Sequence, residues 1–223
     1  MSPLPRPAVT GRALTGLAWA VLLLALSLRG GGGADGPAGD VPPAHGDIAA
    51  VGRPLGTGPS PARAPLPPAT PHRLDIPALG IAAPVVPRDL DRTGAVAAPP
   101  YESAHSVGWF ERGTRPGARG PALFVGHVDT ATRPAVFHPL GSARPGTKVR
   151  VGRSDGSVAE FTVEDVRVVP REGFDAHEVY GPRVPGRAEL RLITCGGGYD
   201  RAAGAYTANV VVSAYLTGVT NLP

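Results

Sequence analysis

The sequence of 223 residues has very little cysteine, since Cys195 is the only one. A single cysteine excludes an internal disulfide framework, so the fold must depend on its hydrophobic core. Potential metal ligands do not cluster at ligand spacing, because the segment "GHVD" offers at most two of them. We therefore expect no metal ion and no other cofactor.

Charge is also scarce. Charged residues make up 18% of the chain, and the formal net charge is +4. The arginines are scattered and are not interleaved with aromatic residues, as they are in a nucleic-acid-binding surface. Nucleic acid is therefore not an expected partner.

Long apolar runs are absent with one exception, "ALTGLAWAVLLLALSL" at residues 13–28. As a helix it would span about 24 Å at about 1.5 Å per residue, which is marginal for a bilayer. Arg6 and Arg12 precede it, so we expect a cytoplasmic segment at 1–12, a signal anchor at 13–29 and an extracellular remainder. A cleaved signal peptide is the alternative interpretation.

Glycine and proline are abundant, at 31 and 27 residues, and they are concentrated after the apolar run. Residues 30–71 show no apolar periodicity and are predicted to be a linker. From residue 72 to 223, short β-branched and alternating runs are separated by turn residues, which predicts a mainly β domain, an antiparallel sheet or barrel. One segment, "RPAVFHPL", is consistent with a short helical turn.

Two polar residues each end an apolar run beside glycine. Cys195 ends "ELRLITC" and precedes "GGG", while His127 follows "ALFVG". A thiol nucleophile needs a base, so the two form a candidate catalytic pair. The competing interpretation is an inert cysteine that packs as a small apolar side chain. Asp129 is a candidate for orienting His127, although an aspartate there more often forms a turn.

The motifs "RLDIPALGIAAPV", "GHVDT", "PAVFHPL" and "LITCGGGYDR" together resemble the sortases, cysteine transpeptidases of Gram-positive cell surfaces, in particular the class F group of actinobacteria. The resemblance runs from about His72 to Leu216. It implies an eight-stranded barrel in which Cys195 attacks the Thr carbonyl of an LPXTG-like sorting signal. His127 would act as general acid and base.

The same resemblance implies partners and further site residues. The partners would be secreted proteins that carry a sorting signal, and a peptidoglycan precursor or another amine acceptor. The enzyme would be held at the cell membrane through residues 13–29. Gly196 would donate its N–H to an oxyanion, and Thr194 and Asn209 are further substrate-binding candidates.

One feature of the sortases is missing from this sequence. They carry an arginine on the strand after the cysteine, but "AYTANVVVSAYL" contains none. Arg201, in the connecting loop, is our first candidate for that role, and Arg191 or Asn209 are the alternatives.

Two other functions remain open from the sequence. An L,D-transpeptidase-like cross-linker is also a cysteine enzyme, but such enzymes place glycine before the cysteine, where this chain has Thr194. The second is a non-catalytic surface binding module with an inert thiol.

Overall fold

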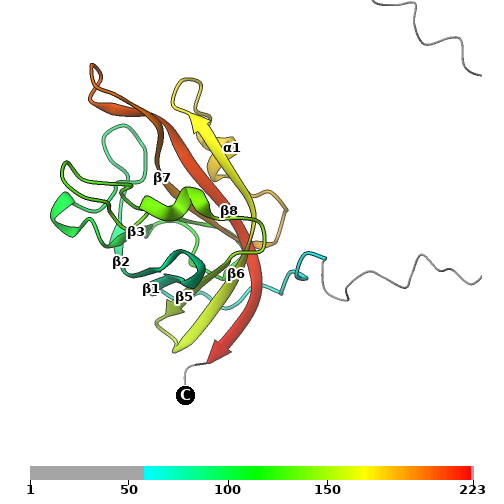
Figure 1. The fold of residues 1–223 in the computed structure, drawn as a ribbon. Coiled ribbons are helices and arrows are strands. Elements are labelled where there is room, and N and C mark those ends of the chain that lie inside the picture. Colours follow the sequence, from blue (N-terminus) through cyan, green and yellow to red (C-terminus); the bar gives the residue numbers. More distant parts are fainter. Residues whose placement is uncertain (1–57, 222–223) are drawn as a thin grey trace, which may run out of the picture. The chain divides into compact units, whose positions relative to one another are not determined.

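The computed structural model describes residues 58–221, which form a closed eight-stranded barrel (Figure 1). The strands are β1 (Pro71–Ile76), β2 (Ile81–Arg88), β3 (Val107–Phe110), β4 (Gly120–Val125), β5 (Lys148–Arg153), β6 (Ser157–Pro170), β7 (Ala188–Asp200) and β8 (Ala205–Asn221). Their order around the barrel is β1-β2-β3-β4-β7-β8-β6-β5. The predicted mainly β barrel is therefore confirmed.

Helical structure is limited to short segments: η2 (Pro77–Leu79), η3 (Tyr101–Ser103), η4 (His138–Ser142) and α1 (Ala176–Tyr180). The segment η4 overlaps the end of the predicted helical turn "RPAVFHPL" at residues 138–140. Within residues 58–221 no helix has both the length and the apolar character needed to cross a membrane. The anchor expected at 13–29 and most of the expected linker lie outside the described residues.

The barrel interior holds the main core. Alternate residues of the strands point inward, as the period of two requires. Leu190 and Leu192 of β7 pack there with Phe124 of β4 and Phe161 of β6, all fully buried. Aliphatic and aromatic burial of this kind is the main stabilising term in a domain without disulfides.

A second apolar cluster lies on the other face of the same strands. Val125, Ile193 and Val211 alternate with interior residues and pack against Val179 of α1. The connection between β6 and β7 contributes α1 to this cluster, so part of the outer face of the barrel is also buried. Cys195 is two residues after Ile193 and therefore lies on the same outer face.

The folded region begins before the boundary expected at residue 72. The N–H of Arg63 donates to the carbonyl of Leu216 at 2.9 Å, and that of Leu66 donates to Gly117 at 2.7 Å. The hydroxyl of Tyr215 donates to the carbonyl of Ser60 at 2.7 Å. These proline-rich residues form no strand of their own, yet they are fixed to the barrel by backbone hydrogen bonds.

Candidate active site

The register between β4 and β7 brings the two candidate catalytic residues to the same edge of the sheet. These strands are parallel, and their pairing runs from Gly120 opposite Ala188 to Val125 opposite Ile193. The N–H of Gly126 continues the ladder to the carbonyl of Ile193 at 3.1 Å. His127 and Cys195 are each two residues beyond the last pair, Val125 and Ile193. Both therefore lie just past the end of the β4–β7 ladder.

His127 and Cys195 line one open cavity of about 1170 Å³. That volume is somewhat larger than that of a typical small-molecule pocket and is sufficient for a peptide segment. The other lining residues come from η3, the segment after β4, the end of β6 and the β7–β8 hairpin, and they include Tyr101, Asp129, Arg171 and Tyr206. The cavity therefore joins segments that are distant in the sequence around a single thiol.

His127 is oriented by two contacts that sequence reasoning missed. Its Nε2 lies 2.7 Å from the carbonyl oxygen of Pro99. Because a carbonyl only accepts, Nε2 must carry the proton, which leaves Nδ1 as the basic nitrogen of the neutral ring. Tyr101 stacks on the imidazole with ring centroids 4.4 Å apart and an interplanar angle of 22°.

The segment around His127 depends on a glycine. A Cβ at Gly126 would lie 2.6 Å from the Phe137 ring and 2.8 Å from Val136, which is closer than side chains pack. The N–H of Phe137 donates to the carbonyl of His127 at 2.9 Å. The absence of a side chain at position 126 thus lets residues 135–137 close over the backbone that positions the imidazole.

Cys195 is exposed to solvent at the cavity, and the surrounding protein still affects its ionisation. Partial burial is the largest influence and raises the pKa of the thiol; the charge of Arg171 opposes this effect, and that of Asp129 adds to it. The free enzyme therefore holds a protonated thiol at neutral pH. Within residues 58–221 no hydrogen bond joins the thiol to the imidazole, although both line the same cavity.

The glycines after Cys195 serve different purposes. A Cβ at Gly196 would lie 2.7 Å from Val210, so this glycine permits close approach of β8. Gly197 has φ +74°, and a Cβ there would lie 2.6 Å from Oγ1 of Thr207. That hydroxyl accepts a hydrogen bond from the N–H of Gly198 at 3.1 Å. Among the three, only Gly197 uses the left-handed conformation.

Asp129 pairs with a tyrosine. Its carboxylate accepts a hydrogen bond from the hydroxyl of Tyr206, and this bond is the main cause that raises the pKa of Tyr206 to about 12. No hydrogen bond from Asp129 to His127 is present in the described region. Asp129 thus connects the segment after β4 with the β7–β8 hairpin.

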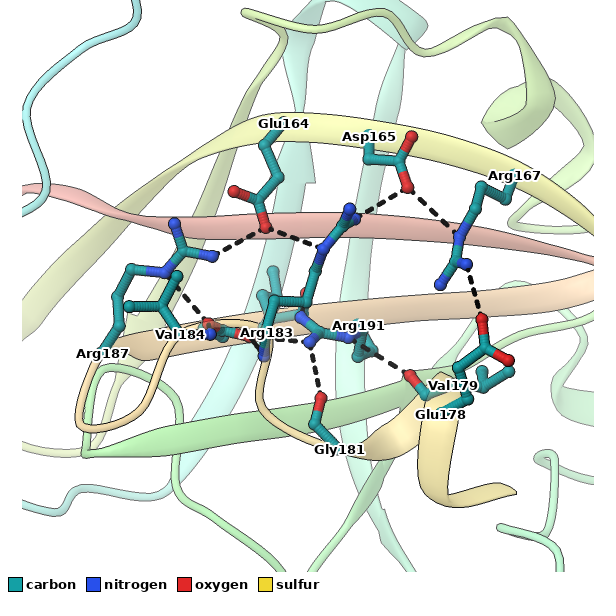
Figure 2. A network of polar contacts seen from close by, with 12 residues as sticks. Glu164, Asp165, Arg167, Glu178, Val179, Gly181, Arg183, Val184, Arg187 and Arg191 are labelled. Atoms are coloured by element: carbon teal, nitrogen blue, oxygen red, sulfur yellow. Dashed lines mark hydrogen bonds and ion pairs between the residues drawn. The ribbon is translucent and has the colours of Figure 1, made fainter. Parts of the chain in front are cut away.

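Arg191 is part of a buried network (Figure 2). Its guanidinium donates to Glu189 at 2.6 Å and to the carbonyls of Gly181 at 2.7 Å and Val179 at 3.3 Å. Its side chain is 1% exposed. These contacts fix the β6–β7 connection to the barrel. They also hold the Arg191 guanidinium in this network, and Arg191 is not among the residues that line the cavity.

The other predicted residues are placed as follows. Arg201 lies in the exposed turn between β7 and β8 and is not among the residues that line the cavity. Asn209 lies directly opposite Cys195 in the β7–β8 ladder, so the two share a face. Thr194 is buried and points to the barrel interior, because neighbouring strand residues alternate in direction. The structure therefore brings Asn209, but neither Arg201 nor the Thr194 side chain, to the thiol's surroundings.

The missed residues had weak sequence signals. Arg171 follows a long alternating strand, and Tyr101 follows a proline pair, patterns that many exposed residues share. Only the pairing of distant strands brings them to Cys195.

A protonated thiol and an imidazole with one free nitrogen, in a cavity of peptide size, are the components of an acyl-transfer enzyme with a cysteine nucleophile. Residues 74–217 match the sortase domain, so the chain belongs to the sortase domain family and is a sortase-type cysteine transpeptidase. This assignment favours the sortase interpretation over the L,D-transpeptidase-like and inert-thiol alternatives.

Solved structures agree on the fold. Sortase A of Listeria monocytogenes superposes with a TM-score of 0.51 and 16% identity, over 70% of this chain and 92% of that one. Sortase C-1 of Actinomyces oris gives 0.50 and 22%, over 69% of this chain and 74% of the other. Identities this low show the fold alone. A search of curated proteins found no match to the sequence.

Proposed function

We propose that this protein is a class F sortase that cleaves an LPXTG-like sorting signal and transfers the secreted protein bearing it to an amine acceptor of the cell wall. The observation that carries the proposal is the shared cavity of Cys195 and His127 within a sortase barrel. Residues 13–29 would anchor the enzyme in the cell membrane, with the catalytic domain outside.

The first step forms an acyl-enzyme. Sγ of Cys195 loses its proton to Nδ1 of His127 and attacks the carbonyl carbon of the sorting-signal threonine. The carbonyl π electrons move to oxygen, which becomes negative, and this charge must be met by donors. The tetrahedral intermediate then collapses, the C–N bond breaks, and the leaving amine takes the proton from the imidazolium.

The second step releases the product. An acceptor amine attacks the thioester carbonyl carbon, His127 takes the proton from the amine, and the C–S bond breaks. The thiolate leaves and is reprotonated. Without an acceptor amine, water can take its place, and the reaction becomes hydrolysis.

The contacts of His127 support these two proton transfers. The carbonyl of Pro99 holds Nε2–H and also stabilises the imidazolium that forms when Nδ1 is protonated. Since burial raises the pKa of the thiol, the thiolate is disfavoured in the free enzyme and forms as the proton moves to His127.

The test is cleavage of a quenched fluorescent LPXTG-type peptide, with and without an added amine nucleophile. We expect cleavage that depends on the thiol, and an added amine should appear in the product. Cys195→Ala and His127→Ala should both lose activity while remaining folded. Unchanged cleavage by Cys195→Ala would reject the proposal, as would failure of the wild-type protein to process any sorting peptide.

A further inference from the structure

The strand after the nucleophile offers no positive charge. β8, from Ala205 to Asn221, contains neither arginine nor lysine. Thr207 of β8 lies two residues before Asn209, so it is on the same face as the thiol. Its hydroxyl accepts a hydrogen bond from the N–H of Gly198 at 3.1 Å. A cation beside the thiol must therefore come from another element.

The register of three neighbouring strands identifies that element. Cys195 of β7 lies opposite Asn209 of β8, and Asn209 lies opposite Val169 of β6. Directly opposed residues share a face of the sheet, and Arg171 is two positions beyond Val169. The N–H of Arg171 donates to the carbonyl of Thr207 at 2.9 Å, so the extended pairing reaches this residue. Arg171 is thus on the face of Cys195, two strands away.

The side chain of Arg171 reaches the same cavity as the thiol. Among the described residues no carboxylate is in ion-pair contact with its guanidinium, whereas Arg191 and Arg187 are paired with Glu189. Its donors are therefore free for a ligand. Arg171 is also the cation that acts to lower the pKa of Cys195, against burial and Asp129.

Other charged or titratable groups also face this cavity and would contribute to any pH dependence. They are His127, Asp129 and Arg133 in the segment after β4, Tyr101 and Glu102 in η3, and Tyr199 and Tyr206 in the β7–β8 hairpin. Arg133 is the other cavity-lining arginine of residues 58–221, and it is not among the causes that shift the thiol. Arg171 is accordingly distinguished by its effect on Cys195 as well as by its position.

We propose that Arg171, at the end of β6, supplies the positive charge of the reaction site and donates hydrogen bonds to the substrate carbonyl oxygen that becomes negative when Cys195 attacks. The donor part of this inference rests on the proposed function. A guanidinium is suited to the role because its charged N–H donors form hydrogen bonds about twice as strong as neutral ones. It also keeps its charge at any physiological pH.

The test measures two properties of Arg171→Ala, Arg171→Lys and a matched control, Arg92→Ala. The control removes the same charge from an exposed turn outside the cavity. The first property is the pH dependence of iodoacetamide alkylation of Cys195, which needs no substrate. The second is kcat/KM for cleavage of a sorting peptide. Thermal unfolding checks that each variant is folded.

We expect Arg171→Ala to shift the alkylation profile to higher pH and to lower kcat/KM at least tenfold. Arg171→Lys should keep the alkylation profile near that of the wild type and recover part of kcat/KM, because the charge remains but the planar fork of donors is lost. Arg92→Ala should change each property less than twofold.

An unchanged alkylation profile in Arg171→Ala would overturn the proposal, and so would an unchanged kcat/KM. If the wild-type protein cleaved no sorting peptide, the proposed function and the donor role would both fail. The alkylation profile would still decide whether Arg171 is the charge that acts on the thiol, so the two failures are distinguishable.

Discussion

Replacing Glu189 by glutamine tests whether the buried arginine network holds the domain together. Glu189 and Arg191 are 0% and 1% exposed, and their charged atoms lie 2.6 Å apart. Glutamine keeps the shape of the side chain but leaves the guanidinium of Arg191 buried without its counter-charge. Removing one partner of a buried ion pair costs about 3–5 kcal/mol of unfolding free energy. In a domain of this size each kcal/mol corresponds to about 2–4 °C in Tm, so we expect Tm to fall by roughly 6–20 °C.

Glu189 has further partners, because Arg187 also pairs with it at 3.0 Å. Glu189 also accepts from the backbone N–H groups of Val184 at 2.8 Å and Arg183 at 3.0 Å, so the network fixes the chain before β7 as well. The matched control is Glu178→Gln, which breaks the exposed pair with Arg167 at 3.0 Å. A surface pair contributes about 0–1 kcal/mol, so the control should unfold close to the wild type.

The assay is thermal or urea unfolding followed by circular dichroism, with both variants measured at neutral pH. Equal small effects of Glu189→Gln and Glu178→Gln would refute the reasoning, because the buried pair would then stabilise no more than a surface pair. A loss of activity without a loss of stability would also contradict it, since it would place Arg191 in the chemistry and not in the framework.

The same carboxylate makes stability depend on pH. Burial acts to raise the pKa of Glu189, but the hydrogen bonds from the Arg183 backbone and from Arg191 outweigh burial, and the pKa is lowered. A lowered folded pKa gives stability that is present above the unfolded value of about 4.3 and is lost as the pH falls through the folded pKa. The stability difference between wild type and Glu189→Gln should therefore shrink in that acidic window.

Other expected outcomes concern the site. Ultraviolet titration should show one tyrosine that ionises near pH 12, and Asp129→Asn should return it toward about 10, because the hydrogen bond to Asp129 favours the protonated hydroxyl of Tyr206; an unchanged titration would refute the pairing. Gly197→Ala should cost at least about 1–2 kcal/mol in unfolding free energy, because Gly197 has a positive φ and its Cβ would lie 2.6 Å from Oγ1 of Thr207, whereas Gly198→Ala, whose Cβ would meet nothing within 4 Å, should cost little; equal costs would argue against the backbone assignment. Peroxide should inactivate the enzyme through Cys195, and a reductant should restore part of the activity; full activity after oxidation of the thiol would contradict a nucleophilic role.

Much of the barrel could be predicted because its signals are local. Strand runs such as "TKVRVGR" alternate with the period of a sheet that has one buried face, and glycine, proline and aspartate mark the turns. The limits of the folded region were harder to predict. Residues 60–70 have no apolar period, yet Leu66 and Arg63 bond to the barrel through their backbones, an interaction that side-chain patterns do not encode.

The candidate site divides in the same way. His127 and Cys195 stood out because each is a polar residue at the end of an apolar run, and parallel pairing of those runs places them together. The proposal of Arg171 could not be made from the sequence, where closeness along the chain favoured Arg201 and the alternation of strand side chains favoured Arg191. Arg171 becomes a candidate only when the β6–β8 register is known. Charge arrangements made by three strands depend on long-range pairing, which no local pattern specifies.

The most direct test of the central claim is intact-protein mass spectrometry after brief incubation with a sorting-signal peptide and acid quenching. A mass increase equal to the acyl fragment up to threonine, mapped by digestion to Cys195 and removed by an added amine, is the result we predict. Peptide cleavage that proceeds with no adduct on Cys195, and at the same rate in Cys195→Ala, would contradict the account.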